Sequence, residues 1–68
     1  MDKKEQVKDL YNRFINYTKT AEQHEFTMLI LMQAKISTGY NDLMKHWNEN
    51  HADIFIRSVG NFLKKLGA

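Results

Sequence analysis

The chain has 68 residues, of which 43% are hydrophobic and 12% aromatic, with three glycines, no proline and no cysteine. This length gives one domain close to the lower limit for independent folding, and the hydrophobic content is too high for a disordered chain. The lack of cysteine excludes disulfide bonds and thiolate metal sites, and the lack of proline favours an almost wholly helical chain.

The formal net charge of +2 is unevenly distributed along the sequence. Residues 1–19 and 54–68 carry net charges of +2 and +3, whereas residues 20–36 and 37–53 carry −1 and −2. Basic ends around an acidic middle are a weaker signal than the basic stripe of a dedicated nucleic-acid binder. No secretory signal follows the charged N-terminus, and the longest apolar run falls far short of the roughly 20 residues that span a bilayer. We therefore expect a cytoplasmic protein.

The first predicted element is an amphipathic helix from Asp2 to about Thr18. Its apolar residues recur at steps of three and four, which is the period of a helix with one buried face. They are Val7, Leu10, Tyr11, Phe14, Ile15 and Tyr17.

The second predicted helix is apolar around nearly its whole circumference over residues 26–36, so it needs cover on more than one side. We therefore expect an all-α fold, a compact bundle of three to four short helices around this central apolar helix, completed by homodimerisation. Thr20 and Gln23 match a capping box, which predicts a helix from Thr20 to about Ser37. Gly39 fits the left-handed residue that follows a helix end.

Two faces of this second helix have different expected partners. We expect the residues Phe26, Leu29, Ile30 and Ile36 to face the first helix. The other side carries residues at steps of four, three and four, namely His24, Met28, Leu31 and Lys35. This side is either covered by the C-terminal helix or forms a contact with a partner or a second copy. If it is a dimer contact, changing Leu31 to Asp should separate the subunits.

After residue 39 the apolar face rotates between two sets of positions. The first set is Tyr40, Leu43, Met44 and Trp47, with His51 and Ile54 continuing the same face, and the second is Phe55, Ile56, Val59, Phe62, Leu63 and Leu66. This change predicts a short third helix over about 41–49 and a fourth over about 51–66, started by Asn50 and ended by Gly67. The alternative is one bent helix. We expect Trp47 to be a core anchor and His51 to be a partly buried histidine.

No residue pattern indicates catalysis or a bound cofactor. The glycines are isolated, so there is no phosphate-binding loop, and neither serine lies in a recognisable nucleophile context. Asp42, His46 and Glu49 would share a face of one helix, which we interpret as a solvated acidic face. We therefore expect a non-enzymatic protein without a metal or cofactor.

By exclusion, the protein is expected to act by binding another macromolecule, with another protein or a second copy as the partner. Small helical proteins of this size often serve as regulators or inhibitors, for example in phages and mobile elements. The alternative is a dimeric DNA-binding regulator that uses basic residues of the first and last helices, namely Lys4, Lys8, Arg57, Lys64 and Lys65. A membrane-surface role for residues 54–66 ranks last, because detaching that helix would expose the core.

Overall fold

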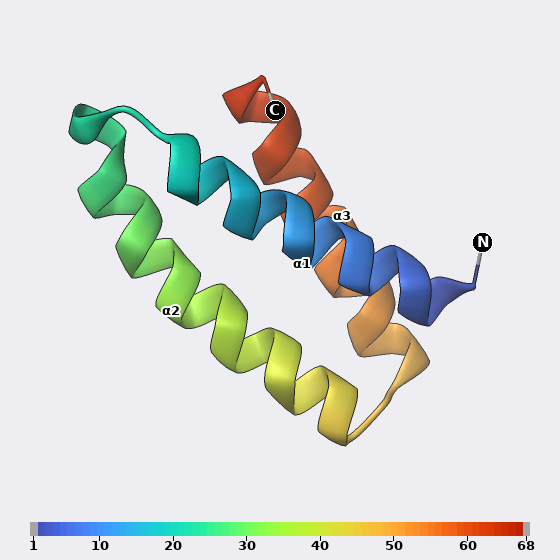
Figure 1. Cartoon of the computed structure of the whole chain (residues 1–68). Helices are drawn as coiled ribbons and strands as arrows, with labels where there is room; N and C mark the ends of the chain where they lie inside the picture. Colours follow the sequence, from blue (N-terminus) through green and yellow to red (C-terminus); the bar gives the residue numbers. More distant parts are fainter. Residues whose placement is uncertain (1, 68) are drawn as a thin grey trace.

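The computed structural model describes residues 2–67, which form three α-helices (Figure 1). They are α1 (Lys3–Thr20), α2 (Gln23–Lys45) and α3 (Glu49–Leu66). The expected all-α bundle is confirmed, with three helices over the described residues. Helix α1 packs against both other helices, whereas α2 and α3 meet over a shorter stretch.

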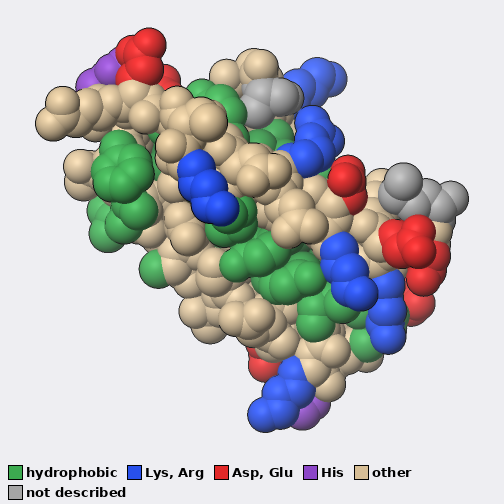
Figure 2. Space-filling view, in the orientation of Figure 1, with side chains coloured by type: hydrophobic (Ala, Val, Ile, Leu, Met, Phe, Trp, Pro, Cys, Tyr) green, Lys and Arg blue, Asp and Glu red, His purple; other side chains and the backbone are tan. Residues whose placement is uncertain are grey.

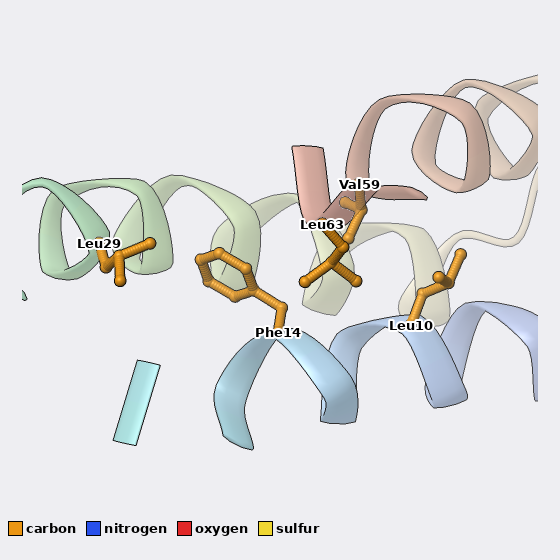
Figure 3. Close-up of a cluster of buried hydrophobic side chains, with 5 residues drawn as sticks. All are labelled: Leu10, Phe14, Leu29, Val59 and Leu63. Carbon is orange, nitrogen blue, oxygen red and sulfur yellow. The ribbon is translucent and has the colours of Figure 1, made fainter. Parts of the chain in front are cut away.

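The core has two parts, and each takes residues from all three helices. The larger cluster consists of Leu10, Phe14, Leu29, Val59 and Leu63, whose side chains converge in Figure 3. The smaller cluster consists of Val7, Leu43 and Ala52. The predicted apolar face of the first helix is confirmed, since it supplies a buried residue on each of three successive turns. Because every helix contributes residues to both clusters, α1 is packed against α2 and α3 along most of the length of α1.

The junction between α1 and α2 differs from the predicted capping box. Thr20 is the last residue of α1, and its hydroxyl donates to the carbonyl oxygens of Asn16 and Tyr17 at 3.3 and 3.2 Å. A threonine hydroxyl bonded to a preceding carbonyl is compatible with continued helix, so the residue does not start a new one. Helix α2 begins at Gln23, after Glu22 in the N-cap position.

The predicted end of the second helix before Gly39 is wrong, because α2 continues through this residue to Lys45. Packing explains the extension. The ring of Tyr40 stacks on that of Tyr11, with centroids 4.0 Å apart, and Leu43 is buried at 5% exposure. Tertiary contacts of this kind stabilise a helix more than the propensity of one glycine weakens it.

The separate helix predicted over 41–49 is also wrong, as is the single bent helix. Residues 46–48 form the connection, and Asn48, rather than Asn50, is the N-cap of α3. Its side-chain oxygen accepts from the backbone N–H of His51 at 3.0 Å, and the His51 side chain is exposed rather than partly buried. The predicted stop at Gly67 is confirmed, with φ of 76° in the left-handed region.

Polar contacts tie the start of α1 to the start of α3. The Lys3 ammonium lies 2.9 Å from the carboxylate of Asp53 and 3.1 Å from that of Glu49. Trp47 is half-buried beside the smaller cluster, and its indole N–H donates to Glu49 at 3.1 Å. That hydrogen bond, followed by the one from Lys3, holds the pKa of Glu49 below its ordinary value.

Helix α2 is not enclosed by the rest of the described chain. Of the residues expected to face α1, Leu29 is fully buried and Ile36 is half-buried, but Phe26 and Ile30 are 45% and 43% exposed. The expectation for Phe26 and Ile30 is therefore wrong. Helix α3 packs mainly on α1, so it leaves this side of α2 uncovered.

Candidate binding surface

The first half of α2 exposes large apolar side chains to solvent. Leu31 is 69% exposed, Met28 46%, and Phe26 and Ile30 nearly as much. Figure 2 shows hydrophobic side chains reaching the surface over this part of α2. Single exposed apolar residues are ordinary, but these four form two neighbouring pairs, Met28 with Leu31 on one side of the helix and Phe26 with Ile30 on another. Such exposed pairs indicate contact surfaces.

The predicted contact residues His24, Met28, Leu31 and Lys35 all lie on α2, and all four are exposed. Positions three and four apart on a helix are neighbours, so these side chains form one continuous seam along α2. Of the two alternatives for this side, cover by the C-terminal helix is excluded by their exposure. The imidazole of His24 lies 3.5 Å from the carboxylate of Glu22 and 3.7 Å from that of Glu25, so its polar neighbours lie close to it in the sequence.

A groove of about 710 Å³ runs between α2 and α3, and the sequence did not predict it. Its apolar residues are Met32, Ile36, Leu43, Ile54, Phe55, Val59 and Phe62, and its polar residues are Lys35, Asp42, His51, Ser58, Asn61 and Lys65. Gly39 also lines the groove, on the α2 side. Three of its apolar residues, Phe55, Val59 and Phe62, belong to the second set of apolar positions in the sequence. Lys35 belongs both to the groove and to the predicted contact seam.

The charged groups of the groove are separated along its length. Because α2 and α3 run in opposite directions from the connection at 46–48, Asp42 and His51 lie at the end near that connection (Figure 1). Lys35 and Lys65 line the far end. The groove is therefore basic at one end and acidic at the other.

Gly39 lies inside α2, and no contact within the chain requires a glycine at this position. A Cβ at this position meets nothing within 4 Å, and the same is true of Gly60 in α3. Glycine within a helix costs about 0.5–1 kcal/mol relative to alanine. We expect both Gly39→Ala and Gly60→Ala to raise the free energy of unfolding by about that amount. Urea denaturation at low protein concentration measures it, and a destabilising Gly39→Ala would contradict the open space seen at this residue.

The basic residues of the alternative hypothesis are divided between α1 and α3. The ammonium of Lys4 lies 5.3 Å from the ring centroid of Trp47, a cation–π geometry that already gives this charge a partner. The side chains of Lys8, Arg57, Lys64 and Lys65 are exposed. In Figure 2 the lysine and arginine side chains lie at several separate places, with acidic side chains among them at one end. The visible face has no continuous basic stripe.

The acidic trio of the sequence does not share one helix face. Asp42 lies on α2, His46 follows that helix, and Glu49 begins α3 with its carboxylate on Trp47 and Lys3. Across residues 2–67 no group of three or more His, Asp or Glu side chains is placed to hold a metal ion. Over the same residues no helix combines the length and apolar character needed to cross a membrane.

No protein-family model, curated protein or solved structure matches this chain.

Proposed function

We propose that the chain is a cytoplasmic, non-enzymatic, dimeric binding protein that acts as a regulator or inhibitor by docking another protein on the exposed face of α2. The observation that carries this proposal is the exposed apolar surface of α2, with Leu31 at its most accessible point. Burial of apolar surface contributes about 25 cal/mol per Å², so a partner that covers several such side chains gains appreciable affinity. The methionine in this surface adapts to irregular partners.

The size of the accessible surface supports an unpartnered face. The chain of 8.1 kDa exposes 4927 Å². The scaling for compact monomers gives about 4,500 Å² for this mass. The excess is about a tenth of the surface, and both the uncovered side of α2 and the elongated outline of 35 × 21 × 15 Å contribute to it.

The partner-binding role is tested with Leu31→Asp, which places a charge at the centre of the exposed face without touching the core. We expect this variant to stay folded and to lose a protein that the wild-type chain retains from a lysate. Asn12→Asp, an equal charge change at an exposed position of α1, is the matched control and should retain that protein. The proposal is wrong if every protein that the wild-type chain and Asn12→Asp retain is also retained by Leu31→Asp.

The same samples test the alternative of a DNA-binding regulator. Binding of DNA through phosphate contacts weakens steeply between about 50 and 200 mM salt, because condensed counterions are released. The proposed protein–protein role predicts no such binding to a generic duplex. Salt-sensitive binding that is lost on replacing Arg57 and Lys64 by Gln would favour the alternative instead.

A further inference from the structure

We propose that two copies of the chain pack groove against groove, with their α2 helices antiparallel and related by a two-fold axis that passes beside Gly39. The inference rests on the dimer of the proposed function and names its interface. Each groove is then closed by the same groove of a second copy of this chain. Two-fold dimers use the same surface of both subunits, so the groove must be complementary to itself.

The charges of the groove meet this condition. Lys35 and Asp42 both line its α2 wall, seven residues apart, and the midpoint between them lies next to Gly39. Seven residues correspond to about 10 Å along a helix, or about two turns, so both side chains lie on one face. An antiparallel two-fold copy sets Lys35 opposite Asp42 of the partner subunit. The symmetry repeats this ion pair, so each interface holds it twice.

The opposite wall of the groove contributes an apolar pair to the same interface. It runs from His51 to Lys65, with Ser58 at its centre. Ile54 and Phe62 lie four residues on either side of Ser58, so the same axis sets Ile54 opposite Phe62 of the partner subunit. Ile54 is 59% exposed in the single chain, and this contact covers it. An apolar pair is thus added beside each ion pair.

This arrangement explains why residue 39 is a glycine. The residue lies on the groove wall, and no atom of the chain approaches the place of a side chain there. A helical glycine is favoured where another backbone comes close, and the two-fold axis brings the two α2 helices together at this residue. Gly60, which does not line the groove, has no such role.

The expected dimer is weak and leaves the rest of α2 available. The groove takes in only parts of α2 and α3, so the interface is small and we expect dissociation in the micromolar range. The axis lies several residues from Met28 and Leu31. Those residues extend beyond the end of the partner subunit's α2 and stay exposed for another protein.

Sedimentation equilibrium of the full chain with charge reversals tests this interface. Each of Lys35→Glu and Asp42→Lys sets like charges opposite each other at two places, and we expect either to raise the dimer dissociation constant by about tenfold or more. The double variant, with both changes, restores the opposite charges and should return to within about threefold of wild type. Arg13→Glu, an equal reversal at an exposed position of α1 outside the groove, is the matched control and should leave dimerisation unchanged.

A cross-linking experiment tests the position of the axis. The chain has no cysteine, so a single introduced thiol reports on one site. Gly39→Cys places two thiols beside the axis, where Cα atoms within about 7 Å permit a disulfide. We expect rapid disulfide-linked dimer on oxidation of Gly39→Cys and none for the exposed control Asn12→Cys.

The outcomes separate this inference from the proposed dimer. A wild-type chain that stays monomeric at about 200 µM, well above micromolar dissociation constants, overturns both. A dimer that is unaffected by the single reversals, or is not restored by the double one, overturns the groove interface and leaves the proposed dimer intact. If Leu31→Asp disrupted the dimer and Ile54→Asp did not, the interface would lie on the seam of α2 that contains Met28 and Leu31, against this inference.

Discussion

Replacement of Phe14 by alanine is expected to leave the chain largely unfolded at 25 °C. Phe14 is fully buried in the larger cluster, and its ring centroid lies 5.9 Å from that of Phe62. Phenylalanine-to-alanine changes in cores cost about 3–5 kcal/mol, and the core of a domain this small supplies about the same amount in total. Far-UV circular dichroism and urea denaturation measure the loss.

Phe26→Ala is the matched control for this prediction. It removes the same atoms from a side chain that is 45% exposed, so it leaves no sealed cavity. We expect it to change the free energy of unfolding by less than about 1 kcal/mol at low protein concentration. If the two variants lost equal free energy of unfolding, Phe26 would have to be buried, and α2 would present a different face to the core than in this fold.

Leu29→Ala is expected to lower the free energy of unfolding by about 2–5 kcal/mol. Leu29 is fully buried in the larger cluster, beside Phe14 (Figure 3), and the cavity left by its side chain cannot be filled by a neighbouring backbone without moving a helix. Chemical denaturation of the variant measures the loss, and a value under about 0.5 kcal/mol, typical of surface changes, would mean that the core lies elsewhere.

Leu31→Ala is the comparison for Leu29→Ala, because Leu31 lies only two positions further along the same helix. Leu31 is 69% exposed, so its truncation should cost less than about 0.5 kcal/mol in the monomer. The difference between the two leucines therefore reports which face of α2 is inside. A larger loss for Leu31→Ala than for Leu29→Ala would reverse the assignment of the two faces.

The buried face of α1 was predictable because one strong helical period determines it. Val7, Leu10 and Phe14 recur at steps of three and four, and nothing in the neighbouring residues competes with that pattern. The end of α3 was predictable for a similar reason, since Gly67 follows the last periodic residue and adopts the left-handed conformation. Local chemistry was sufficient at both places.

The middle of the chain was not predictable in this way, because contacts distant in sequence decide it. Gly39 has the local signature of a helix end, but the stacking of Tyr40 on Tyr11 continues the helix past it. The segment 26–36 is apolar all round, so its periodicity did not indicate which side faces α1. Only the packed helices show that Phe26 and Ile30 lie outside the core.

The candidate surfaces were predictable to different degrees. The seam from His24 to Lys35 followed from spacing on one helix, and the structure leaves all of it exposed. The groove depends on the distance between α2 and α3, which no pattern within either helix specifies. Its charge separation became visible only after the fold had brought Lys35 and Lys65 to one end and Asp42 to the other.

The central claim is that the surface left open by α2 and α3 is completed by a second copy of the chain. Sedimentation equilibrium of the wild-type protein over about 10–200 µM, a range that spans micromolar dissociation constants, tests it directly. We expect an apparent mass that rises with concentration from the 8.1 kDa of one chain towards twice that value. A mass that stays at 8.1 kDa throughout that range would mean that no second copy covers this surface.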